Sequence, residues 1–228
     1  MSRCQKIGRL LRDAMEFLLY PRGARCVCCG DMRGRKDDIF CPECRNAYMP
    51  MYDSAQWNNF RGVERMYSAC RYRAPALDAV KAFKFSGNGY AGAFMAEEMI
   101  KAAREMGLPA MDAVVPVPLH KKRLRERGFN QSDILAEALA KELQTSKEDW
   151  LVRVKNTRKQ STLPMEERAA NIADAFRAAE ACKGKTILLV DDVCTSGATG
   201  HACAKALRAA GARQVELFVF ADATPKQI

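Results

Sequence analysis

The chain has 228 residues and a hydrophobic fraction of 48%, enough for one substantial folded domain and a small appendage. No window approaches the roughly 20 uninterrupted apolar residues of a membrane-spanning helix, which excludes an integral membrane protein of that kind. Lys and Arg total 37 against 27 Asp and Glu, and the resulting net charge of +10 favours polyanionic partners such as nucleic acid or a phosphorylated metabolite.

Residues 1–20 predict an amphipathic helix. Their apolar side chains fall at helical spacing, and Asp13 and Glu16 interrupt any continuous apolar run, which fits a helix docked on the core better than a secretion signal. The basic polar face leaves a membrane-surface role open. Since the chain has ten cysteines and no secretion signal, we expect a cytoplasmic protein whose thiols are reduced or bind metal.

Four cysteines predict a zinc site. Cys26 and Cys29 form one C-x-x-C pair, and Cys41 and Cys44 form a second. Two such pairs can present four thiolates in a tetrahedron around one Zn²⁺, and this ligand set is structural because it leaves no open position for catalysis. Metal binding would also supply folding energy that this apolar-poor segment lacks. Cys28 is an alternative to Cys29, although C-x-C fits such a turn less well.

From about residue 66, short β-branched runs alternate with segments of helical periodicity. The sequence predicts strands at 65–73, 112–119, 150–154, 185–190 and 214–221, and helices at 75–84, 91–106, 130–143, within 166–178 and at 197–210. This alternation is typical of an α/β fold, a parallel sheet with helices on its faces. The predicted organisation is an N-terminal helix at 1–20, a zinc-binding knuckle at 21–50, a polar linker at 51–65 and the α/β domain at 66–228.

Residues 187–200, ILLVDDVCTSGATG, carry the main candidate site. In open parallel sheets ligands bind beyond the carboxyl ends of the strands, and this strand delivers Asp191 and Asp192 to that edge. The segment from Thr195 to Thr199 then turns into a helix N-terminus, where free N–H groups and the helix dipole favour an anion. The predicted anion-binding residues are Thr195, Ser196, Gly197, Ala198 and Thr199.

Carboxylates beside an anion site predict a sugar phosphate, since hydroxyl groups donate to carboxylates while the phosphate occupies the loop. A divalent metal beside the aspartates also fits. The motifs of P-loop and dinucleotide-binding proteins are absent. A phosphatase-like use of the aspartate pair leaves the Thr/Ser/Gly loop unexplained, and a plain helix cap needs only one such side chain.

Two basic segments are candidates for the same edge. Residues 120–131 follow a predicted strand, and Arg123, Arg125 and Arg127 can clamp a pyrophosphate; the alternative is a solvated charged loop. Residues 153–171 have little apolar periodicity and predict either a lid over the site or a surface linker. The polar side chains that we expect in a lid include Arg158, Gln160 and Arg168.

The segment ILLVDDVCTSGAT resembles the binding motif of type I phosphoribosyltransferases, which use 5-phosphoribosyl 1-pyrophosphate (PRPP) with Mg²⁺. The resemblance implies that Asp191 and Asp192 hold the ribose hydroxyls, that residues 195–199 bind the 5-phosphate, that the segment after the 112–119 strand contacts pyrophosphate, and that a flexible catalytic loop lies near 153–171.

Three segments together resemble the ComF family of competence-associated proteins, in the same order and over nearly the full length. They are the zinc knuckle, VVPVPLHKKRLRERGFNQ and RVKNTRKQSTLPMEERAANIADAF. This resemblance implies a PRPP-binding protein of DNA uptake that transfers phosphoribosyl to an unknown acceptor. The alternative is a non-catalytic sensor of PRPP or a nucleotide that binds single-stranded DNA or other competence proteins. The aromatic residues are few and not interleaved with the basic segment, which disfavours direct DNA binding. No general base is evident, because His120 and His201 fit surface or packing roles better.

Overall fold

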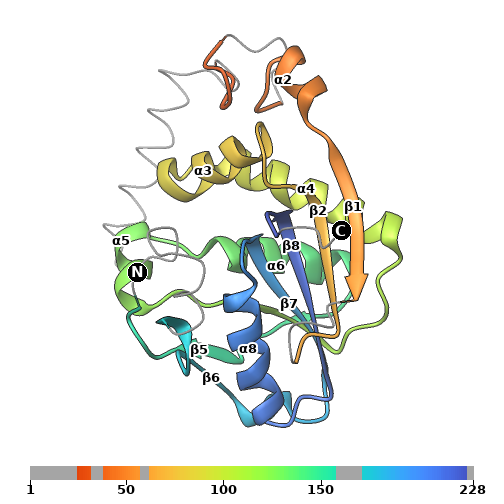
Figure 1. The fold of residues 1–228 in the computed structure, drawn as a ribbon, viewed down its shortest axis with the longest axis vertical. Coiled ribbons are helices and arrows are strands. Elements are labelled where there is room, and N and C mark those ends of the chain that lie inside the picture. Colours follow the sequence, from red (N-terminus) through yellow and green to blue (C-terminus); the bar gives the residue numbers. More distant parts are fainter. Residues whose placement is uncertain (1–24, 32–37, 57–61, 158–170, 225–228) are drawn as a thin grey trace.

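The computed structural model describes residues 25–31, 38–56, 62–157 and 171–224 (Figure 1). The predicted N-terminal helix and the candidate lid residues Arg158, Gln160 and Arg168 lie outside these ranges. In the described part of the chain, no helix is both long and apolar enough to cross a membrane.

The centre of the molecule is a six-stranded sheet in the order β1-β2-β8-β7-β3-β4. Its strands are β1 (Pro50–Gln56), β2 (Arg65–Arg71), β3 (Ala113–Pro116), β4 (Ser146–Lys147), β7 (Thr186–Cys194) and β8 (Gln214–Asp222). All neighbouring strands are parallel except β1, which pairs antiparallel with β2 at one edge. The predicted α/β fold is therefore confirmed.

Helices cover both faces of the sheet (Figure 1). The helices α3 (Ala76–Ser86), α4 (Gly89–Met106) and α6 (Gln131–Glu142) share one buried cluster with Leu188 and Phe218. The helix α8 (Ala198–Ala209) shares a second cluster with Leu189 and Val219. Because successive strand residues point to opposite faces, β7 and β8 supply one side chain to each cluster in turn, which explains their continuous apolar sequences.

Smaller elements complete the fold. They are α2 (Pro42–Ala47), α5 (Lys121–Arg127), η2 (Glu180–Cys182) and a separate antiparallel pair of β5 (Leu151–Arg153) and β6 (Phe176–Ala178). The predicted strand at 150–154 thus exists, but it does not join the main sheet. Of the partly helical prediction at 166–178, the described end forms β6.

Two predictions of irregular structure were wrong. The residues assigned to a linker include β1, whose polar side chains are tolerated because an edge strand needs only one neighbour and leaves one side to solvent. The basic segment predicted as a loop contains α5, which buries no side chain and so lacks an apolar periodicity to reveal it. His120 caps this helix by accepting a hydrogen bond from the Lys122 N–H, and Gly128 ends it at a φ of 85°.

Gly92 of α4 permits a close contact between helices. A Cβ atom at this position would lie 2.6 Å from Cε2 of Phe83, whose ring is already packed 5.3 Å from that of Phe129. Gly92→Ala should therefore destabilise the protein by about 1–3 kcal/mol, the usual cost of overpacking, despite the better helix propensity of alanine. Chemical denaturation measures this change.

Gly89, in the first turn of the same helix, provides the matched control. A Cβ atom there meets nothing within 4 Å, so Gly89→Ala should leave stability unchanged or slightly raised. Equal effects of the two substitutions would contradict the packing argument.

Candidate functional site

Asp191 and Asp192 lie where β7 outruns its neighbour β3. The last paired residues of these strands are Pro116 and Val190, while β7 continues to Cys194 alongside β8. After β3 the chain leads into α5, and after β7 it leads into α8. The predicted gathering of the aspartates, the basic segment and the anion loop at one sheet edge thus follows from the topology.

Asp192 is held by a lysine from the first helix of the domain. The residue is only 4% exposed, and its Oδ2 lies 2.8 Å from Nζ of Lys84, the antepenultimate residue of α3. A buried carboxylate needs such a partner to remain ionised. The sequence analysis did not identify Lys84, because it lies about 100 residues before the aspartate and in a helix with ordinary amphipathic spacing.

Asp191 has a different environment from its neighbour. Its Oδ1 accepts hydrogen bonds from Ser132 Oγ of α6 and from the backbone N–H of Asp192, both at 2.9 Å. Burial, followed by the charge of Asp192, raises the pKa of Asp191 to about 7, against the lowering effect of Lys84. The charge of Asp192 thus opposes ionisation of Asp191, as a like charge in close contact does.

The loop after β7 forms a small pocket with the start of α8. Five predicted residues line this pocket, together with hydrophobic residues of β7 and β8: Asp191, Thr195, Gly197, Ala198 and Thr199. Gly197 adopts a φ of 74°, which glycine accommodates without strain. The Ser196 hydroxyl is buried and has no hydrogen-bond partner among the described residues, so it is available to a ligand. Cys194 is buried beside the pocket, where burial raises the pKa of its thiol.

Three arginines surround the aspartates. Arg127 of α5 donates to Oε1 of Gln131 at 2.6 Å and lies within electrostatic range of Asp192 and of Arg123, one turn earlier. Arg153 of β5 is 9% exposed, its charged neighbours include Arg123 and Asp191, and its Nε has no acceptor among the described residues. Burial lowers the pKa of both Arg127 and Arg153. Arg125, by contrast, is exposed.

Arg153 thus belongs to a strand, as predicted for residues 150–154. It is not part of a lid, although the predicted lid or linker segment began at this residue. Its guanidinium lies 5.5 Å from the Phe176 ring and bonds the Thr157 hydroxyl. No carboxylate in the described part of the chain pairs with this guanidinium, and a buried charge is costly without a partner, so a bound anion would stabilise it.

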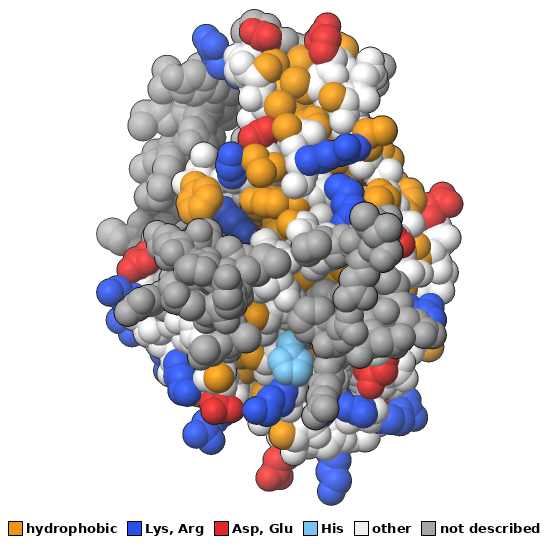
Figure 2. Space-filling model, in the orientation of Figure 1, with side chains coloured by type: hydrophobic (Ala, Val, Ile, Leu, Met, Phe, Trp, Pro, Cys, Tyr) orange, Lys and Arg blue, Asp and Glu red, His pale blue; other side chains and the backbone are white. Residues whose placement is uncertain are grey.

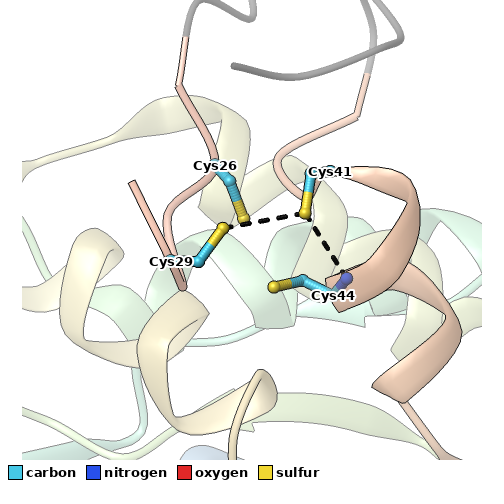
Figure 3. A group of neighbouring side chains, drawn as sticks. All are labelled: Cys26, Cys29, Cys41 and Cys44. Atoms are coloured by element: carbon cyan, nitrogen blue, oxygen red, sulfur yellow. Dashed lines mark hydrogen bonds between the residues drawn. The ribbon is translucent and has the colours of Figure 1, made fainter. Parts of the chain in front are cut away.

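The second candidate site is the cysteine cluster beside α2 (Figure 3). The Sγ atoms of Cys26, Cys29, Cys41 and Cys44 all lie within 4.8 Å of one another, and those of Cys29 and Cys41 are 3.7 Å apart. Four sulfurs at the usual Zn–S distance of about 2.3 Å from one ion would be separated by about 3.8 Å. The cluster could therefore hold a metal such as zinc, and it excludes Cys28.

The protonation of these thiols also suits a cation. Burial would raise the pKa of Cys26, but backbone N–H groups of Cys29, Cys41 and Cys28 lower it to about 7. Burial and the adjacent Cys41 sulfur instead raise the pKa of Cys44 to about 12. Several thiolates cannot coexist at this distance without a positive ion, and a bound metal would deprotonate the remaining thiols.

The cysteine cluster is packed onto the α/β domain. Phe40 and Tyr48, which flank α2, each lie 5.2 Å from the Phe94 ring of α4 in an edge-to-face arrangement. Arg45 of α2 lies 3.4 Å from Glu98 of α4, which is 2% exposed. Cys26 and Cys41 consequently share one buried cluster with the domain core.

Comparison with known proteins gives the family. A model of the phosphoribosyl transferase domain matches residues 130–227. The DNA utilization protein YhgH of Salmonella typhi is 34% identical over 160 residues, which cover 68% of this chain and 70% of that protein. Competence protein F of Haemophilus influenzae is 30% identical over 168 residues, covering 70% of this chain and 73% of that protein. The chain belongs to the ComF family.

Membership of the ComF family confirms the resemblance that the sequence motifs carry. Competence protein ComFC of Bacillus subtilis, 27% identical, aligns over 198 residues, which cover 84% of this chain and 80% of that protein. The domain-model match begins one residue before α6 and extends beyond β8, so it contains Ser132, both aspartates and residues 195–199. Lys84 and the arginines of α5 precede it.

Proposed function

We propose that this ComF protein binds PRPP with Mg²⁺ at the carboxyl end of β7 and transfers its phosphoribosyl group to an acceptor. The observation that carries the proposal is the combination of two adjacent carboxylates, a pocket at the start of α8 that Asp191 lines, and arginines within electrostatic range of those carboxylates. A simple phosphate would not require the carboxylates, and a neutral sugar would not require the arginines.

Each group has a separate task in this proposal. Asp191 and Asp192 accept hydrogen bonds from the ribose hydroxyls, and residues 195–199 with the N-terminus of α8 bind the 5-phosphate. Arg123, Arg127 and Arg153 bind phosphoryl oxygens and stabilise the departing pyrophosphate. Mg²⁺, when bound with PRPP, would neutralise further charge on the leaving group. Arg158, Gln160 and Arg168 are proposed as lid residues that exclude water.

We also propose that the protein acts in the uptake or use of DNA, since its relatives are named DNA utilization and competence proteins. Other competence proteins and single-stranded DNA are candidate partners, although Lys and Arg side chains on the face in Figure 2 are scattered among acidic ones. The proposed domain organisation keeps the N-terminal helix at 1–20 and the knuckle at 21–50, while β1, from the predicted linker at 51–65, joins the sheet of the domain predicted at 66–228. We propose that the cysteine cluster is a structural zinc site and that the protein is cytoplasmic. Both proposals are consistent with reduced thiols.

Calorimetric titration of the protein with Mg–PRPP tests the proposal. We expect saturable binding, and pyrophosphate release when a panel of nucleobases is added. Absence of binding would overturn both the transferase and the sensor functions. Binding without pyrophosphate release from any acceptor would favour the non-catalytic sensor.

The affinity for Mg–PRPP should rise between pH 6 and pH 8. Below its pKa of about 7 Asp191 is protonated and is a poor acceptor for ribose hydroxyls; above it the carboxylate accepts them. Calorimetry at several pH values measures the change. Asp191→Asn serves as the control, because its affinity should vary with pH only through protonation of the ligand. Identical pH profiles for the two proteins would contradict a role for Asp191 ionisation.

A further inference from the structure

The side chain of Phe85 projects from the end of α3 into solvent. It is 75% exposed, the largest exposed fraction among the large hydrophobic side chains that the structure describes. In Figure 2 hydrophobic side chains gather over the region of α3 and α4, with Lys and Arg side chains beside them. A single exposed aromatic ring needs no explanation in itself, so its neighbours decide what it can do.

Those neighbours are the charged residues of the proposed PRPP site. The preceding residue, Lys84, holds Asp192 at 2.8 Å, and the guanidinium carbon of Arg127 lies 5.8 Å from the centre of the Phe85 ring. Asp192 is itself a charged neighbour of Arg127. The ring therefore lies beside a proposed pyrophosphate-binding arginine, on the helix whose Lys84 holds a proposed ribose-binding carboxylate.

The backbone that carries this ring is firmly held. Two residues earlier, Phe83 is buried against Gly92 and Phe129. Two residues later, Gly87 ends the helix at a φ of 62°. An exposed ring on a fixed backbone loses little conformational freedom when a flat ligand covers it, because few bonds remain to be ordered.

We propose that Phe85 and Arg127 form a stacking surface for the planar aromatic base that accepts the phosphoribosyl group. This inference rests on the proposed function. Arg127 covers one side of the Phe85 ring, and a base can stack on the remaining exposed surface, since every nucleobase has a π face.

The position of the ring also suits the transfer step. A ring nitrogen of the stacked base would donate its lone pair to C1 of the ribose. The bond from C1 to the pyrophosphate oxygen breaks with both electrons leaving on pyrophosphate, and the proton of the attacking nitrogen passes to a pyrophosphate oxygen. The nearby arginines would stabilise the charge that leaves.

Saturation-transfer NMR on the full chain, with Mg²⁺, pyrophosphate and ribose 5-phosphate present, tests base binding without turnover. The probes are adenine, hypoxanthine, cytosine and uracil, with 5,6-dihydrouracil as a non-planar comparator of uracil. We expect at least one base to bind the wild type. Phe85→Ala and Phe85→Leu should weaken that binding roughly 5- to 150-fold, the range of base–aromatic stacking, whereas Phe85→Tyr should retain it.

Val152→Ala is the matched control, because Val152 is 50% exposed on β5 and should leave base binding unchanged. Equal binding by the wild type and Phe85→Ala, or no binding by any base, would overturn the inference. Binding of an oligothymidine but of no free base would overturn it in favour of a strand-binding surface. Base binding that depends on Phe85 in a protein that fails to bind Mg–PRPP would overturn the proposed transfer while leaving the stacking surface intact.

Discussion

Replacing both carboxylates of the site, by Asp191→Asn with Asp192→Asn, should lower the affinity for Mg–PRPP about 100-fold or more. A hydrogen bond to a charged acceptor contributes about 1.5–3 kcal/mol, and about 1.4 kcal/mol corresponds to a tenfold change in affinity. Asparagine preserves the size of the side chain and can still accept from Ser132, so the substitution removes charge more than shape.

The direction in which the double substitution changes the affinities for PRPP and for pyrophosphate distinguishes a sugar-phosphate site from a plain anion site. Without the Asp192 carboxylate, Lys84 and Arg127 face the site with no negative charge between them. Pyrophosphate alone should then bind the double variant as tightly as the wild type, or more tightly. Tighter binding of PRPP itself by the variant would show that the carboxylates do not hold ribose hydroxyls.

Two further measurements test whether the loss of affinity reflects a general loss of charge or of folding. Asp133→Asn changes a carboxylate on the same helix as Ser132 that pairs instead with Lys147, and it should not alter PRPP affinity. Asp191→Asn alone should also be thermally more stable than the wild type, and more so at pH 8 than at pH 5. The pKa of Asp191 in the fold lies above the value of about 3.9 in unfolded chains, so its ionisation costs folding free energy as the pH rises toward 7.

The parts of the site that could be predicted from sequence are those that are local in the chain. The aspartates, the predicted anion-binding loop and the start of α8 follow one another within residues 191–199. Their place at a ligand-binding edge can be predicted once the preceding segment is recognised as a strand of a parallel sheet. The cysteine pairs are similarly local, because each pair sits on one turn.

The contacts that were missed come from distant segments. Lys84 and Ser132 reach Asp192 and Asp191 from α3 and α6, and no spacing in the sequence relates a lysine to an aspartate about 100 residues later. Arg153 lies in the strand predicted at 150–154, but its approach to the aspartates was missed for a related reason: a three-residue strand in a separate two-stranded sheet carries no pattern that shows where it packs. These are tertiary effects that local propensity does not contain.

Removal of metal from the cysteine cluster should lower the melting temperature of the whole protein by about 10 °C or more, in one transition. Structural zinc contributes about 10–16 kcal/mol to folding in isolated zinc fingers, and about 1 kcal/mol shifts the melting temperature of a chain of this size by about 2–4 °C. The effect should reach the α/β domain because Phe40 and Tyr48 pack on Phe94, which contacts Phe220 of β8 at 6.2 Å between ring centroids.

Single cysteine variants decide which sulfurs hold the metal. Elemental analysis should give about one zinc per wild-type chain and per Cys28→Ser chain, but little in Cys29→Ser or Cys44→Ser, since the four clustered sulfurs exclude Cys28. Retention of zinc by Cys29→Ser with its loss in Cys28→Ser would assign the alternative ligand. A knuckle that melts in a separate transition, with the main one unmoved, would contradict the shared core. Such a result would mean that the zinc-binding knuckle folds independently of the α/β domain. The contact of Arg45 with Glu98, which joins the two parts, would then contribute little to stability.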